Sequence, residues 1–116
     1  MTLPLYQVDA FTTKLFGGNP AAVIPLEKWL DDSTLQNIAA ENNLSETAFF
    51  LKEGEHYNIR WMTPANEVPL CGHATLASAF VIFNFIEKNS NKIKFMSKSG
   101  ELIVERNGEM LTLDFP

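Results

Sequence analysis

The sequence predicts one α+β domain in which a strongly curved, mostly antiparallel, barrel-like sheet surrounds a central apolar helix. Most of the chain consists of short alternating segments joined by tight turns, which is typical of antiparallel strands. One segment, at about residues 73–87, is apolar on nearly every side, and a helix of that kind is buried. The 116 residues are enough for a single domain, residues 1–116, with a substantial core.

The first predicted elements are two strands and a surface helix. Residues 3–11 are β-prone, and residues 14–26 contain a Gly-Gly-Asn-Pro turn that leads into a second short strand. The segment at about residues 32–43 begins with acidic residues and places Leu35 and Ala39 at helical spacing. We therefore expect an outer helix with one narrow buried stripe.

The middle of the chain predicts a β-hairpin. Residues 45–54 and 56–63 alternate well, and Tyr57, Ile59 and Trp61 share one face of the second strand. The Glu-Gly-Glu sequence between these segments is suited to a tight turn. Both strands are therefore expected to lie side by side with one apolar face.

Three further strands follow the apolar helix. KIKFMSKSG, ELIVERNG and EMLTLDFP alternate, and Asn107-Gly108 between the last two is a strong hairpin signal. The chain thus predicts about seven strands and two helices. A doubly wound parallel sheet is excluded, because the hairpin turns require antiparallel pairs and one crossover helix is too few.

Composition and charge exclude several classes of function. The formal net charge is −5 and no basic run is present, so we expect no nucleic-acid partner. The longest apolar stretch is too short to cross a bilayer and residues 1–20 lack the order of a signal peptide, so we expect a cytoplasmic protein that does not contact membranes. A single cysteine excludes an internal disulfide, and Cys71 with His56 and His73 lacks the usual zinc-site spacing, so no metal is expected.

The sequence CGHAT at the start of the apolar helix is a candidate anion site. The first-turn N–H groups of a helix have no partner within the helix, and Gly72 leaves the amides of His73, Ala74 and Thr75 sterically open. A helix N-terminus carries roughly half a positive charge, which would hold a substrate carboxylate without any Lys or Arg. The alternative is that Thr75 or a nearby side chain caps the helix and that nothing binds.

Three side chains are candidates for proton transfer, each with a structural alternative. Cys71 is either a small buried hydrophobe or a thiolate whose pKa the helix lowers, which would make it a nucleophile or base. His73 is either an acid or base or a hydrogen-bonded histidine at the rim of the core. Glu46 begins an apolar strand and is either solvated at the sheet edge or buried with a raised pKa, as a general acid/base requires. Asn19, in GGNPAAV, is typical of a turn.

Three motifs, in this order, resemble those of one family. DAFTTKLFGGNPAAV, NNLSETAFF and CGHATLASAFVIF, closed by GELIVERNGEMLTLDFP, resemble the phenazine-biosynthesis F-type (PhzF-like) isomerase and epimerase family, a relative of diaminopimelate epimerase. The resemblance covers essentially the whole chain. It implies a fold of two similar domains, each a barrel-like sheet around a central helix, with the active site between them. The chain corresponds to the N-terminal half of such a protein.

The resemblance also implies roles for individual residues. Glu46 matches the general acid/base, which moves a proton between carbons of a small carboxylate substrate. Asn19 and Ser45 match residues that line the pocket, and Gly72 and His73 match the helix-tip segment that holds the substrate. No metal and no organic cofactor are implied.

The function that the sequence predicts is therefore isomerase or epimerase-type proton transfer on a small carboxylate-bearing metabolite. Members of the family are much longer, so the site would be completed by a homodimer partner or by a missing C-terminal domain or chain. The alternative is a non-catalytic small-carboxylate binding module or a truncated, inactive remnant of the family. The epimerase relatives use a pair of cysteines, which one chain with Cys71 alone cannot supply, so Cys71 is expected to be a bystander.

Overall fold

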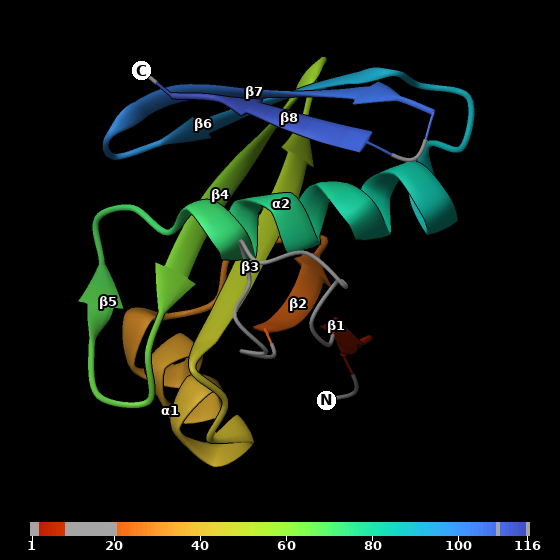
Figure 1. Ribbon diagram of the computed structural model, residues 1–116. Helices are drawn as coiled ribbons and strands as arrows, with labels where there is room; N and C mark the ends of the chain where they lie inside the picture. Colours follow the sequence, from red (N-terminus) through yellow and green to blue (C-terminus); the bar gives the residue numbers. More distant parts are fainter. Residues whose placement is uncertain (1–2, 9–20, 109, 116) are drawn as a thin grey trace.

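The computed structural model describes residues 3–8, 21–108 and 110–115, which form an eight-stranded sheet around a central helix (Figure 1). The strand order is β1-β2-β3-β4-β6-β7-β8, and β5 pairs with β4 outside this path. The α+β class and the sheet wrapped around a helix are thus as predicted. The strands are β1 (Tyr6–Val8), β2 (Ala21–Leu26), β3 (Glu46–Glu53), β4 (His56–Met62), β5 (Glu67–Val68), β6 (Lys92–Ser97), β7 (Gly100–Asn107) and β8 (Met110–Asp114).

Antiparallel pairs predominate, and both predicted hairpins are present. β3–β4 and β7–β8 are antiparallel neighbours, and Gly54 and Gly108 in their turns have φ of 63°, which glycine adopts readily. β2–β3 and β4–β6 are parallel instead. Each parallel pair is connected through a helix, so the chain has two crossovers where the sequence indicated one. The short strand β5 was not predicted.

Helix α1 (Asp32–Asn42) packs on the outer face of the sheet, as its narrow apolar stripe predicts. Leu35 and Ala39 are fully buried in a cluster with Phe49 of β3 and Met62 of β4. The helix ends at Asn43, whose φ of 52° is a left-handed cap conformation. The outer helix therefore closes one small core on the face opposite α2.

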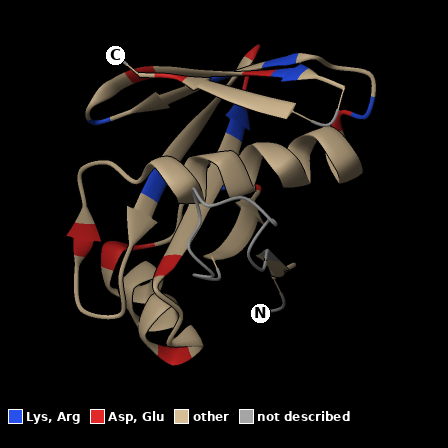
Figure 2. Ribbon diagram, viewed as in Figure 1, with Lys and Arg blue, Asp and Glu red and all other residues tan. Residues whose placement is uncertain are grey.

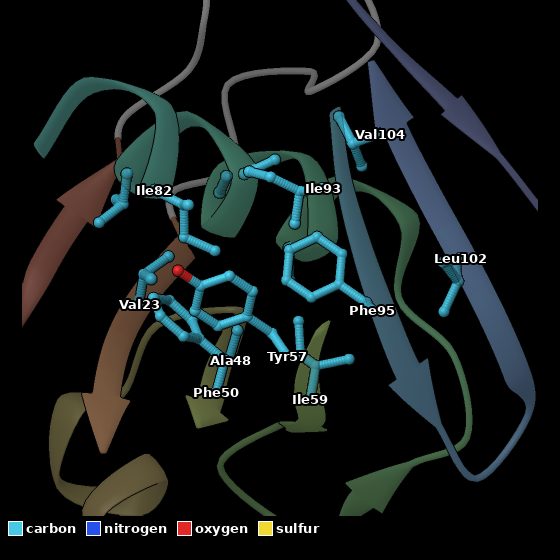
Figure 3. Close-up of a cluster of buried hydrophobic side chains, with 14 of the residues drawn as sticks. Val23, Ala48, Phe50, Tyr57, Ile59, Ile82, Ile93, Phe95, Leu102 and Val104 are labelled. Carbon is cyan, nitrogen blue, oxygen red and sulfur yellow. The ribbon is translucent and has the colours of Figure 1, made fainter. Parts of the chain in front are cut away.

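Helix α2 (Gly72–Val81) is enclosed between β2–β4 on one side and β6–β8 on the other (Figure 1). Its small residues Ala74, Ala77 and Ala79 are buried and let strands approach the helix closely. Side chains from both parts of the sheet meet beside it, including Phe50, Tyr57 and Phe95 (Figure 3). The helix and the turn that follows it carry no charged side chain (Figure 2), which explains their position in the core.

The apolar segment is not one uniform helix, which the sequence pattern did not reveal. After Val81 it continues as a π-helix, η1 (Ile82–Ile86), and burial ends at Phe83. Phe85 and Ile86 are 56% and 42% exposed. The expectation of burial along the whole segment is therefore wrong for its last turn. No helix in the described residues is long and apolar enough to span a membrane.

Candidate functional site

Glu46 is the first residue of β3, and its position in the strand decides which way it points. Side chains alternate between the two faces of a strand, so Glu46 shares a face with Ala48 and Phe50, which both pack in the core around α2. The Glu46 side chain is only 20% exposed. The structure therefore places it largely inside the protein, next to the helix, and not in solvent at the sheet edge.

His73 is the second residue of α2 and contacts Glu46 directly. Its Nε2 atom lies 3.0 Å from Oε2 of Glu46, and its side chain is 22% exposed. A neutral imidazole can donate one hydrogen bond to a carboxylate in this geometry, and a protonated imidazole forms an ion pair with it. The two predicted proton-transfer groups thus form one unit, although they come from different elements of the fold.

Cys71 is the N-cap residue of α2 and belongs to the same cluster. Its Sγ atom lies 3.8 Å from Nδ1 of His73, and the residue is 9% exposed. The pKa of the Cys71 thiol is raised to about 11, mainly by burial and in addition by the Glu46 carboxylate, while the amides of Ala74 and His73 oppose the shift without cancelling it. The thiol is therefore protonated at neutral pH, and the alternative of a helix-activated thiolate is excluded.

One carboxylate, one imidazole and one thiol therefore meet at the N-terminal end of α2. Each of Glu46, Cys71 and His73 offers an atom within 4.8 Å of the other two. The sequence places Cys71 beside His73, but the approach of Glu46 to both was not predicted. The signal was available in the strand pattern, because Glu46 has the same parity as the apolar residues that face the helix.

Thr75 fixes the backbone at this end of the helix. Its side chain is fully buried, its hydroxyl accepts a hydrogen bond from Trp61 Nε1 (3.0 Å), and it donates to the Cys71 carbonyl (2.8 Å). The Thr75 N–H also donates to that carbonyl, at 3.1 Å. Thr75 thus does not cap the first turn. The amides of His73 and Ala74 lie closest to the cluster.

Gly72 leaves room here for a neighbouring ring and does not adopt an unusual backbone angle. A Cβ atom at this position would lie 3.3 Å from the ring of Phe115, which packs against the start of the helix. Ser45 is exposed and directly precedes Glu46 at the start of β3. Asn19, which was predicted to line the pocket, lies outside the described residues.

A second hollow, of about 370 Å³, lies on the other face of β4 and is separate from the cluster. Arg60 and Lys98 supply its positive charge, but both bind Glu67. Arg60 also contacts Asp32 at 3.0 Å. With its charges paired within the protein, this hollow has no group in evidence for proton transfer, and Glu46, His73 and Cys71 remain the candidate site.

Comparison with known proteins identifies close relatives over the whole chain. A family profile described as phenazine biosynthesis-like protein matches residues 8–114. An uncharacterized isomerase of Pseudomonas aeruginosa is 54% identical over 116 residues, which are 100% of this chain and 45% of that protein. The phenazine biosynthesis-like domain-containing protein of Homo sapiens is 48% identical over 124 residues, covering 100% of this chain and 43% of that protein.

A solved structure agrees with the sequence comparison. The crystal structure of a PhzF-family phenazine biosynthesis protein from Enterococcus faecalis superposes with a TM-score of 0.91 at 56% identity, and covers 100% of this chain and 45% of that one. The chain therefore spans less than half the length of these relatives, and it matches their fold over that part.

Proposed function

Since this chain belongs to the phenazine biosynthesis-like family, we propose that it supplies one half of an isomerase or epimerase site for proton transfer on a small carboxylate-bearing metabolite. Relatives at high identity are named isomerases, which supports this class of reaction. The observation that carries the proposal is the contact between Glu46 Oε2 and His73 Nε2 at 3.0 Å. It joins a carboxylate and an imidazole, both largely buried, at a helix N-terminus.

Glu46 is the general acid/base in this proposal. Its carboxylate takes a proton from a carbon near the substrate carboxylate, and the electron pair of the C–H bond moves into the conjugated system. Glu46 then returns a proton, which can exchange with solvent while the carboxyl group holds it, to another carbon of the substrate; delivery to the opposite face of the first carbon requires an acid on the surface that completes the site. His73 orients Glu46, and the amides at the start of α2 stabilise the negative charge that develops on the substrate.

Another protein surface completes the site, either a second domain of a longer chain or a second copy of this one. Two apolar side chains flank the cluster and are open to solvent: Leu70, which precedes Cys71, is 38% exposed, and Phe115, which packs on Gly72, is 54% exposed. A covered active site excludes water, and these side chains are suited to contact the surface that covers it. The length of the relatives is consistent with a second domain in this position.

Proton exchange at carbon tests the proposal without knowledge of the natural substrate. The protein is incubated in D₂O with a panel of small unsaturated and α-substituted carboxylic acids, and deuterium incorporation is followed by NMR. Glu46→Gln is expected to reduce exchange by about 10²–10⁴-fold, because it removes the base but keeps the size of the side chain. Glu55→Gln, in the exposed β3–β4 turn, is the matched control and should leave exchange unchanged.

Two outcomes would contradict the proposal. Exchange that persists at the wild-type rate in a folded Glu46→Gln protein removes Glu46 as the acid/base. Binding of a small carboxylate without any exchange, at an affinity that Glu46→Gln does not alter, favours a non-catalytic binding module instead.

A further inference from the structure

The Glu46, Cys71 and His73 cluster contains the three donor types that bind zinc. Zinc in proteins is held by thiolate sulfur, imidazole nitrogen and carboxylate oxygen, and sites with three protein ligands leave a fourth position for water or substrate. The cluster offers one ligand of each kind, and the three ligand atoms lie within 4.8 Å of one another. Nothing in the acid/base proposal uses the thiol, so its presence needs a separate explanation.

The three side chains are close enough to be compared with the ligands of a tetrahedral site, in which neighbouring ligand atoms have a defined spacing. Metal–sulfur bonds of about 2.3 Å and metal–nitrogen or metal–oxygen bonds of about 2.0–2.1 Å place neighbouring ligand atoms about 3.3–3.6 Å apart. Glu46 Oε2 lies 3.0 Å from Nε2 of His73, whereas Cys71 Sγ lies 3.8 Å from Nδ1, so the two contacts involve different nitrogens of one ring and only one nitrogen can bind a given ion. Metal binding therefore requires a rotation of the Cys71 side chain or of the imidazole ring, so that the sulfur and the carboxylate oxygen approach the same nitrogen.

The backbone that carries two of the ligands is held firmly. Thr75 bonds to the Cys71 carbonyl through both its N–H and its hydroxyl, and Trp61 bonds to the same hydroxyl. Cys71 and His73 are therefore kept at a constant separation, which favours metal binding because little ordering remains to be done. The side chains of His73 and Glu46 are about one-fifth exposed, so an ion can reach them.

Charge determines the kind of binding to expect. Metal binding displaces the proton of the Cys71 thiol to solvent, and the resulting thiolate and the carboxylate together neutralise a divalent cation, but the positive end of α2 points at the same place and works against it. This opposition favours reversible binding over a permanent structural ion. Hard cations such as Mg²⁺ gain little from sulfur and nitrogen ligands, whereas Zn²⁺ and Co²⁺ prefer them.

We propose that Glu46, Cys71 and His73 reversibly bind one zinc-like divalent cation, which inhibits the protein by occupying its acid/base. The metal site itself stands on geometry and ligand chemistry, and only its inhibitory effect rests on the proposed function. In this account Cys71 is not a bystander: it makes the site sensitive to thiophilic metals.

Cobalt binding tests the site directly, because Co²⁺ replaces Zn²⁺ and a thiolate–cobalt bond gives a charge-transfer band in the near ultraviolet. Titration of the full chain with CoCl₂ is expected to produce this band with one equivalent bound, and ZnCl₂ but not MgCl₂ should abolish it. Cys71→Ser should lose the band. Glu46→Gln and His73→Gln should each weaken binding by at least about tenfold.

His56→Gln is the matched control, because His56 lies at the other end of β4, within 3.2 Å of Asn58 Oδ1. This variant should bind cobalt like the wild type, and circular dichroism checks that every variant is folded. The proposal is overturned if the folded wild type gives no band, or if His56→Gln weakens binding as much as His73→Gln does. It is also overturned if Glu46→Gln binds at wild-type affinity.

The inhibitory effect is measured separately from the site. Where the wild type exchanges protons at carbon, stoichiometric ZnCl₂ should stop the exchange and a chelator should restore it, while Cys71→Ser should require at least about tenfold more zinc. Cobalt binding without proton exchange would uphold the metal site and contradict the proposed function. Proton exchange without a cobalt band would uphold the proposed function and contradict the metal site.

Discussion

Each end of the central helix meets a carboxylate, but the two carboxylates have different partners. At the C-terminal end Glu87 accepts hydrogen bonds from Lys52 Nζ (2.8 Å), Ser90 Oγ (3.1 Å) and the hydroxyl of Tyr57. Lys52 and then Tyr57 lower the pKa of the Glu87 carboxyl, and they more than offset its partial burial. This carboxylate is therefore saturated with donors and stays ionised, which suits it to hold the helix in place.

At the N-terminal end Glu46 contacts an imidazole, at 3.0 Å from His73 Nε2, and a neutral thiol lies beside both. An imidazole has two ring nitrogens and can both donate and accept hydrogen bonds, whereas an ammonium group such as that of Lys52 only donates them. The difference separates two uses of a buried carboxylate. Three donors make the Glu87 carboxylate part of the structure, whereas in the proposed function the Glu46 carboxylate, beside an imidazole, exchanges protons with a substrate.

The largest loss of stability is expected from Arg106→Ala, which removes hydrogen bonds at the C-terminal end of the central helix. Arg106 donates hydrogen bonds to the carbonyls of Phe83 (3.3 Å), Lys88 (2.9 Å) and Ser90 (2.8 Å), so it ties the π-helix to the turn that follows it. Its removal should lower the free energy of unfolding by about 2–4 kcal/mol, measured by urea denaturation. The exposed Lys92→Ala should change it by less than about 0.5 kcal/mol.

The Arg106→Ala variant also tests whether stability at the C-terminal end of the central helix is independent of proton exchange at its N-terminal end. Proton exchange should persist in folded Arg106→Ala protein, because this residue lies at the end of the helix away from Glu46. An unchanged unfolding free energy in Arg106→Ala would show that the hydrogen bonds of Arg106 do not stabilise the C-terminal end of the central helix.

A smaller effect is expected from Tyr57→Phe, which keeps the ring in the core and removes only the hydroxyl that donates to Glu87. Loss of a hydrogen bond to a charged group should lower the unfolding free energy by about 1.5–3 kcal/mol. Tyr6→Phe, whose ring stacks on Phe85 with centroids 5.3 Å apart, is the control and should be nearly neutral. Equal effects of the two substitutions would argue against a structural role for the Glu87 network.

Much of the fold was predictable because it depends on local patterns. Alternating segments and turn residues such as Gly54 and Gly108 indicated the hairpins, and the all-apolar segment indicated the buried helix. The π-helical turn and the short strand β5 were not predictable, since they depend on tertiary contacts. Arg106, for instance, fixes the end of the helix from a strand far along the chain.

The candidate site was predictable in part. The sequence singled out Glu46, Cys71 and His73 one by one, but their contact depends on how β3 is placed against α2. The sequence also left Thr75 as a possible cap, whereas its bond to Trp61 makes it an anchor for the helix. That role could not be predicted, because it requires the pairing of β4 with the helix.

The smallest effect is expected for a third carboxylate, Glu67 of β5, which lies away from both ends of the helix and is paired with Arg60 of β4. The Arg60 guanidinium, with Lys98, holds the pKa of Glu67 at about 2, below its usual 4.5. A carboxyl with a lowered folded pKa stabilises the protein above its unfolded pKa and loses this contribution as pH falls. Stability should therefore decrease between about pH 5 and pH 2 by up to about 1 kcal/mol from this group.

Glu67→Gln measures that contribution. The difference in unfolding free energy between wild type and this variant should be largest near neutral pH and should vanish toward pH 2. A difference that does not depend on pH would show that Glu67 contributes by packing and not by charge.

The central claim is that the two ends of the helix divide stability and function between Glu87 and Glu46. The most direct test is the unfolding free energy of Glu87→Gln compared with that of Glu46→Gln, measured at pH 7 under identical conditions. We expect Glu87→Gln to lose about 1.5–3 kcal/mol, because it breaks charge-assisted hydrogen bonds, and Glu46→Gln to stay within about 1 kcal/mol of the wild type. A loss in Glu46→Gln as large as that in Glu87→Gln would contradict the division.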